Sequence, residues 1–202
     1  NLDGTGAVCG VSDYAGGVDN SLIDLVAALP SLAQGDPIDI QGDVDAGLAC
    51  AVSGPTCTRL DLMVHVSVGT DCVIVEIQDA EGTMLMSPVV GSLDGSGNFR
   101  ADGGALLLPI PLRTSSGTID WNLALSSVII TGTRSDTTLS NVVIGGALLQ
   151  AAFETAMMDL LPLLGANIVF EDIEPILSNL YDVQDTGVCS ALSAGFTAAG
   201  AI

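Results

Sequence analysis

The chain has 202 residues and no lysine, and its four arginines face 24 acidic residues, for a formal net charge of −20. Because nucleic acids and anionic membrane surfaces are bound through clusters of Lys and Arg, we expect neither as a partner. Hydrophobic residues nevertheless make up 49% of the chain, which is unlike a disordered protein and predicts one folded domain over residues 1–202. No apolar stretch has the length and basic flanks of a transmembrane helix.

The first predicted segment, residues 1–36, begins with a Gly- and Asp-rich stretch and contains one short helix. In residues 21–32 the apolar side chains recur at helical spacing, and Pro30 stands near the predicted end. The second segment, residues 37–145, is predicted to be an antiparallel β region. Its first run, residues 37–49, alternates apolar with acidic residues and therefore predicts a strand with one acidic face.

Alternation is clearest in the middle of the β region, where tight turns rich in Gly and Asp separate the runs. This rhythm is typical of an antiparallel meander. Pro109 and Pro111, two residues apart, place their run at a sheet edge or at a bend. The predicted strands cover residues 60–68, 73–78, 83–90, 105–112 and 118–133.

The third segment, residues 146–202, is predicted to be helical and to end in a closing strand. Residues 147–164 place apolar side chains at steps of three and four over more than half of the helix girth, so this helix must be buried. A shorter helix is predicted over residues 175–181. We therefore expect an α+β fold: a curved antiparallel β-sheet, sandwich- or half-barrel-like, with the long apolar helix and shorter helices packed on one face.

The five cysteines lack the paired spacing of a zinc site, and the chain has one histidine. We interpret them as disulfide-forming residues of an exported protein, in the extracellular space, at the cell surface or in the periplasm. Cys50 and Cys57 flank a short turn-rich loop, and Cys9 and Cys189 lie near the two ends of the sequence. Cys72 is then left over, either as a buried thiol or as a link between subunits.

Oxygen-bearing side chains recur at every second position from Asp94 through Ser96 to Asn98, with Asp102 nearby. This spacing is that of a calcium-binding loop, although the glutamate that completes an EF-hand is missing. A hairpin turn uses the same residue types, so both interpretations stay open. We expect no other cofactor.

Other acidic groups give weaker indications of calcium. Asp39, Asp43 and Asp45 share one face of a predicted strand, either as a calcium patch or as a solvated acidic face. Asp182, Asp185 and Gly187 form a still weaker version of a calcium loop. Carboxylates are so numerous in this chain that their pairing alone does not indicate a site.

His65 is the only histidine and lies on the polar face of a predicted strand. Asp61 and Ser67 share that face, but side chains on one strand point in parallel and do not converge as a catalytic triad requires. Motifs of hydrolases and nucleotide-binding enzymes are missing as well, so we expect no enzymatic activity. Four methionines are interpreted as core residues rather than copper ligands: Met84, Met86, Met157 and Met158.

Residues 139–147 read Leu-Ser-Asn-Val-Val-Ile-Gly-Gly-Ala, and residues 190–198 read Ser-Ala-Leu-Ser-Ala-Gly-Phe-Thr-Ala. The C-terminal half thereby resembles secreted or lipoprotein-type proteins of Gram-negative bacteria. In those proteins an S-N-G-x-[IL]-G-G strand end precedes a helix, an Asp-rich loop and a closing S-x-G-x-G-F-x-A strand. Here Val142 stands where glycine is usual, and the Asp-rich loop is reduced to residues 182–187. The resemblance implies export and a cell-surface setting, with no catalytic role.

Two functions fit these patterns. The first is a non-enzymatic exported structural or interaction protein that assembles with copies of itself, because the apolar surplus and the strand edges offer surfaces for pairing. The second is a carrier of an apolar ligand such as a lipid, with the long helix lying in the curved sheet. A hydrolase would need a site that these patterns do not contain.

Overall fold

The structure is a computed structural model that describes residue 9 and residues 20–32, 38–45, 62–79, 81–114, 117–164 and 169–201. Its helical elements are α1 (Leu22–Leu32), α2 (Ile40–Asp45), α3 (Gln150–Leu163), α4 (Phe170–Leu177) and the 3-10 helix η1 (Ser178–Leu180). Its strands are β1 (Leu62–Val68), β2 (Cys72–Asp79), β3 (Met84–Leu93), β4 (Asn98–Asp102), β5 (Ala105–Thr114), β6 (Gly117–Arg134), β7 (Thr138–Leu149), β8 (Val183–Asp185) and β9 (Val188–Ala201).

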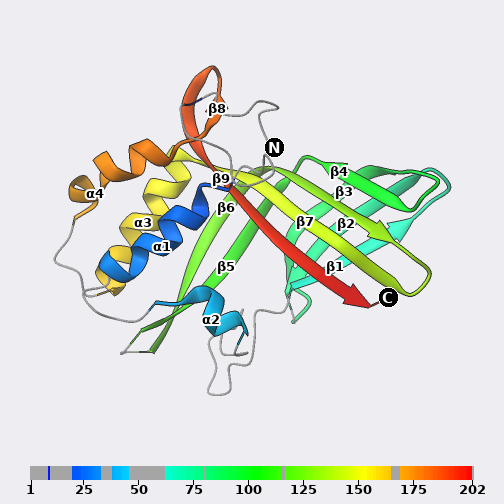
Figure 1. The fold of residues 1–202 in the computed structure, drawn as a ribbon, viewed down its shortest axis with the longest axis horizontal. Coiled ribbons are helices and arrows are strands. Elements are labelled where there is room, and N and C mark those ends of the chain that lie inside the picture. The colour runs from blue at the N-terminus through cyan, green and yellow to red at the C-terminus, as the bar shows by residue number, and fades with distance from the viewer. Residues whose placement is uncertain are drawn as a thin grey trace.

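These strands form one antiparallel sheet in the order β1-β2-β3-β4-β6-β7-β9-β8. β5 follows β4 along the same edge of β6, and it also pairs with β3. The helices α3, α4 and η1 are inserted between β7 and β8 (Figure 1). The predicted α+β class and the meander are therefore confirmed. The strand path does not join β8 to β1, so the sheet is not a closed barrel, and its sandwich- or half-barrel-like form stays a prediction.

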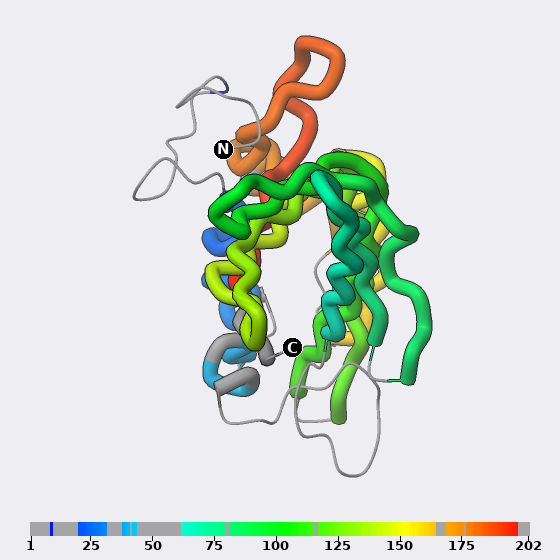
Figure 2. The backbone as a smooth tube through the Cα atoms, turned by 90° about the vertical axis from the view of Figure 1, so that its right-hand side faces the viewer, coloured from blue at the N-terminus to red at the C-terminus, as the bar shows by residue number. Residues whose placement is uncertain are grey.

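The sheet is sharply bent across its middle strands. β3 carries one extra residue between Met86, which pairs with Ile77, and Val89, which pairs with Val75. Gly103 and Gly104 both have positive φ and separate β4 from β5, a conformation that glycine adopts without steric cost. Figure 2 shows the result: the β1–β2 hairpin and the β6–β7 hairpin lie on opposite sides of the folded sheet.

β6 keeps its apolar side chains on one face through the bend. Leu125 is buried, Ser127 has a φ of 50°, and the next buried side chain is that of Val128. The extra residue of this β-bulge reverses the alternation, as the register shift between Ser126 and Ile129 also indicates. Without the bulge the residues after it would turn their apolar side chains to solvent.

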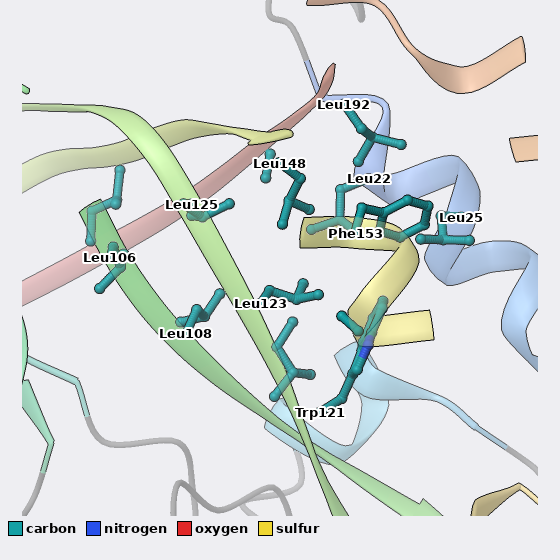
Figure 3. Close-up of a cluster of buried hydrophobic side chains, with 14 of the residues drawn as sticks. Leu22, Leu25, Leu106, Leu108, Trp121, Leu123, Leu125, Leu148, Phe153 and Leu192 are labelled. Carbon is teal, nitrogen blue, oxygen red and sulfur yellow. The ribbon is translucent and has the colours of Figure 1, made fainter. Parts of the chain in front are cut away.

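The main core lies where helices cover the buried face of β5 and β6. α3 packs on β6, and the side chain of Phe153 is fully buried there (Figure 3). Phe153 also meets the ring of Tyr181 edge-on, at 6.5 Å between centroids. Burial, followed by the charges of Glu154 and Glu174, raises the pKa of Tyr181 to about 12. The close-up shows Phe153 in one buried cluster with Leu22 and Leu25 of α1, Leu106 and Leu108 of β5, Trp121, Leu123 and Leu125 of β6, Leu148 of β7 and Leu192 of β9.

Three sequence predictions are wrong in extent or type. The predicted long apolar helix over residues 147–164 is a 14-residue helix, because its first three residues belong to β7, and it buries only one side. Residues 37–49 contain the helix α2 instead of a strand, since Asp39 accepts a hydrogen bond from the Gly42 N–H at 2.9 Å and caps the helix. The second predicted helix begins at Phe170, five residues earlier than expected.

Other expectations are confirmed. The helix predicted over residues 21–32 is α1, and the five predicted strands correspond to β1, β2, β3, β5 and β6. Pro109 and Pro111 lie in β5, whose edge away from β6 pairs with β3 only through Leu106, at the far end of the strand from both prolines. Proline is tolerated there because its missing N–H removes no ladder hydrogen bond.

The two faces of α3 should respond differently to truncation. We expect Phe153→Ala to lower the free energy of unfolding by about 3–5 kcal/mol, because it leaves a void in the packed core. Met158→Ala on the same helix is the control, since that side chain is exposed and its loss should change stability by less than about 0.5 kcal/mol. Urea denaturation followed by circular dichroism measures both, and equal losses would contradict the placement of α3.

Candidate functional site

The predicted calcium loop forms the hairpin turn between β3 and β4. Asp94 Oδ1 accepts hydrogen bonds from the Ser96 and Asn98 N–H groups at 2.8 and 2.9 Å, and Oδ2 accepts one from Asn98 Nδ2 at 2.9 Å. These bonds hold the pKa of Asp94 below its usual 3.8, with the side chain of Asn98 as the largest cause. The amide oxygen of Asn98 in turn accepts from Thr133 Oγ1 at 3.0 Å.

Asp102, the fourth predicted ligand, points to a different partner. Its carboxylate forms an ion pair with Arg100, at 2.7 Å from the guanidinium NH2 and 2.9 Å from Nε. The carboxylates of Asp94 and Asp102 and the amide oxygen of Asn98 therefore already have partners within the protein. Among the described residues no three His, Cys, Asp or Glu side chains gather as a metal would need. Calcium at this turn stays a prediction.

Two measurements on Asp94 test the hydrogen bonds of this turn and its predicted binding of calcium. We expect the carboxyl carbon of Asp94 to titrate below pH 3.8 by NMR, and to move toward 3.8 in Asn98→Ala, which removes the largest cause of the shift. Because the folded-state pKa is lowered, the stabilisation by these bonds is present above pH 3.8 and is lost as the pH falls through the folded pKa. Addition of calcium at neutral pH is the second arm: a saturable change in the Asp94 resonances supports the calcium interpretation.

The predicted disulfide between the ends of the chain is present. Cys9 and Cys189 are bonded, with 5.7 Å between their Cα atoms, and 180 residues separate them. Closure of so long a loop restricts the unfolded chain and stabilises the fold by about 5 kcal/mol. Cys50 and Cys57 lie outside the described residues. Cys72 is free, as expected from the odd count, but it is exposed, so its interpretation as a buried thiol is wrong.

The remaining candidates do not converge. His65 and Ser67 point outward on β1, and the predicted partner Asp61 lies outside the described residues. Asp43 bonds Arg113 at 3.0 Å instead of lining an acidic strand face, while Asp39 caps α2. The structure does not describe the side chains of Asp45, Asp61, Cys50 and Cys57.

The methionines divide between the core and the surface. Met86 and Met157 are buried, as the core interpretation requires, whereas Met84 and Met158 are exposed. Met84 lies on β3 and Met158 on α3, so the prediction that these two methionines are core residues is wrong.

A buried polar cluster was missed at the sequence level. The carboxyl group of Asp182 accepts hydrogen bonds from the N–H of Ser193, at 2.7 Å, and from its hydroxyl. The Ser193 oxygen accepts the N–H of Ser21 at 2.9 Å, so the cluster ties the start of α1 to β9. All three residues are buried. Asp182 stood out only as part of a short calcium-type loop, because its partner Ser193 is 11 positions away and Ser21 lies 172 positions from Ser193.

A neighbouring residue completes this contact with β9. Asn20 donates from Nδ2 to the Gly195 carbonyl at 3.3 Å and accepts the Gly195 N–H at 3.1 Å. Side chains of Asn20 and Asp182 therefore satisfy backbone groups of β9 beyond the point where β8 ends. This end of the sheet is closed to further strand pairing at Ser193 and Gly195.

The cluster makes a stability prediction. Asp182→Ala leaves the N–H and hydroxyl of Ser193 buried without an acceptor, and we expect a loss of about 2–3 kcal/mol in the free energy of unfolding. Asp185→Ala removes an equal charge from an exposed position three residues away and should change little. Urea titrations compare the two variants. Similar midpoints would show that the buried cluster is not a stabilising contact.

The outer face of β1, β2 and β3, opposite the buried core, carries four exposed apolar side chains. Ile74 lies opposite Val90 in the pairing of β2 with β3, and the side chain of Val90 is 69% exposed. Met63 lies opposite Gln78, which in turn lies opposite Met84. We call Met63, Ile74, Met84 and Val90 the outer patch. Between its two rows, His65 faces Glu76 across the strands.

Comparisons with known proteins add no assignment. No protein-family model, no curated protein and no solved structure matches this chain. The resemblance of the C-terminal half to secreted Gram-negative proteins therefore stays a prediction. None of the described helices is long and apolar enough to cross a bilayer.

Proposed function

We propose that this chain is a non-enzymatic exported interaction protein that associates with copies of itself through the β1–β3 side of the sheet. The observation that supports the proposal is the outer patch, where Ile74 and Val90 stand directly opposite each other and exposed. Exposed apolar side chains gathered on one face are a common mark of a binding surface. In a chain of net charge −20, the four apolar side chains of this surface give two copies a contact to set against the repulsion between their carboxylates.

Export is supported by the disulfide. The Cys9–Cys189 bond is consistent with an oxidising compartment, because such bonds are rare in reduced cytosolic proteins. The absence of convergence at His65 and in the Asp94 turn, within the described residues, favours a binding role over catalysis. A saline exterior also suits self-association of a polyanion, since salt screens repulsion between exposed charges beyond a Debye length of about 8 Å.

Surface variants test the proposal. We expect Ile74→Ser with Val90→Ser to lower the molar mass observed at high protein concentration by light scattering in 0.15 M salt, with little change in thermal stability. The control is Val188→Ser, which removes an apolar side chain of similar exposure from the β8–β9 hairpin and should leave the molar mass unchanged. A wild-type chain that stays monomeric and releases lipid into an organic extract would contradict the proposal and favour the apolar-ligand carrier.

A further inference from the structure

β1 ends the sheet with an edge that no described residue pairs with or covers. Among the described residues β1 pairs only with β2, and it is the first strand of the hydrogen-bonded path. Its sequence, Leu-Met-Val-His-Val-Ser-Val, contains no carboxylate, no Lys or Arg, no proline and no glycine. Edge strands in soluble proteins are usually blunted by charges, prolines, bulges or a cover. β1 has seven regularly paired residues and no register shift.

The opposite end of the sheet shows the contrast. β8 has only three residues and carries Asp185, while the N–H groups of Ser193 and Gly195 in β9 are bonded by the side chains of Asp182 and Asn20. Both devices oppose the addition of another strand. The sheet is therefore protected at one end and suited for pairing at the other.

The hydrogen bonds of the hairpin fix which groups of β1 face outward. The N–H of Gly69 donates to the Cys72 carbonyl at 2.8 Å, so these two residues form a hydrogen-bonded pair. Antiparallel ladders alternate between hydrogen-bonded and non-bonded pairs. Counting back along the pairing of β1 with β2, the N–H and C=O groups of the even-numbered residues point away from β2: Leu62, Val64, Val66 and Val68.

We infer that two copies of this chain pair through β1, antiparallel and around a two-fold axis at His65. This inference rests on the proposed self-association and adds to it a contact along the edge of β1, beside the outer patch. The four residues whose N–H and C=O groups point away from β2 are placed symmetrically about His65. Leu62 therefore pairs with Val68 of the second copy, and Val64 pairs with Val66. Such pairing forms about eight backbone hydrogen bonds between the copies.

A second copy is the occupant that fits the charges. Two chains of net charge −20 repel wherever carboxylates meet, and β1 brings none to the contact. A strand pairing antiparallel with itself is self-complementary, which is what a two-fold dimer requires. On the inner face, the half-buried side chains of Val64 and Val66 gain each other as cross-strand partners.

The pairing also joins the outer patches of the two copies. Met63 of one copy lies opposite Ser67 of the other, so the row Met84, Gln78, Met63 continues into Ser67, Ile74 and Val90 of the second copy. The central row reads Glu76, His65, His65, Glu76, with a carboxylate at each end. The apolar surface of each monomer thus becomes one surface of a continuous sheet.

Cysteine cross-linking tests the register. In a Cys72→Ser background, which removes the exposed thiol, His65→Cys places two thiols opposite each other across the axis. Non-bonded antiparallel pairs have Cα atoms about 4.5 Å apart, within the range that a disulfide bridges. We expect a disulfide-linked dimer on a non-reducing gel. Ser67→Cys in the same background should stay monomeric because Met63 faces it, and adding Met63→Cys to it should restore the cross-link.

Three outcomes separate this inference from the proposed function. Cross-linking of Ser67→Cys as fast as His65→Cys would indicate random collision and overturn the register. If no cross-link forms, but Ile74→Ser with Val90→Ser still abolishes association, the edge pairing is overturned and the proposed function stands. A chain that stays monomeric at every concentration would overturn both.

A charge variant gives a second measurement that does not depend on disulfide chemistry. Ser67→Asp adds a carboxylate to the outer face of β1, opposite Met63 of the second copy. We expect the dimer dissociation constant measured by sedimentation equilibrium to rise about tenfold or more. Ser87→Asp adds the same charge to an exposed position of β3 and should leave the dissociation constant unchanged. Equal effects of the two variants would assign the change to net charge and contradict edge pairing.

Discussion

The fold depends on keeping one face of a bent sheet continuously apolar. A strand turns its side chains to alternate faces, so a bend without an added residue would send half of the apolar set into solvent. The bulge at Ser127 and the irregularity between Met86 and Val89 add residues where the sheet bends, and the buried side chains of β3 and β6 stay on the inner face through it. α1 and α3 then close that face around Phe153.

The same sheet treats its two ends differently. At β9, Asp182 and Asn20 supply the hydrogen bonds that another strand would offer, and the first helix is fixed to the sheet by those bonds. At β1 the described residues offer no side chain of this kind, and the strand contains no Asp, Glu, Lys or Arg. In a polyanion, an edge strand without carboxylates is where the proposed pairing of two copies would meet the least charge repulsion.

Local patterns were sufficient for part of the molecule. Alternation predicted β2 and β6, helical spacing predicted α1, and the positions of Cys9 and Cys189 near the two ends predicted their disulfide. The spacing of apolar residues gave a wrong prediction where strand pairing or a helix cap decides the local structure. Residues 147–149 fit a helix by period, but pairing with β9 holds them in β7, and the cap of Asp39 makes a helix from a run that alternates like a strand.

The sequence by itself determined the antiparallel class and the turn at Asp94, because each depends on residues a few positions apart. Only the tertiary structure decided that Cys72 is exposed, that Asp182 and Ser193 share a buried hydrogen bond, and that β1 ends the sheet. Those facts depend on which distant segments meet. Burial and edge position are properties of the assembled sheet, and no local period of side chains encodes them.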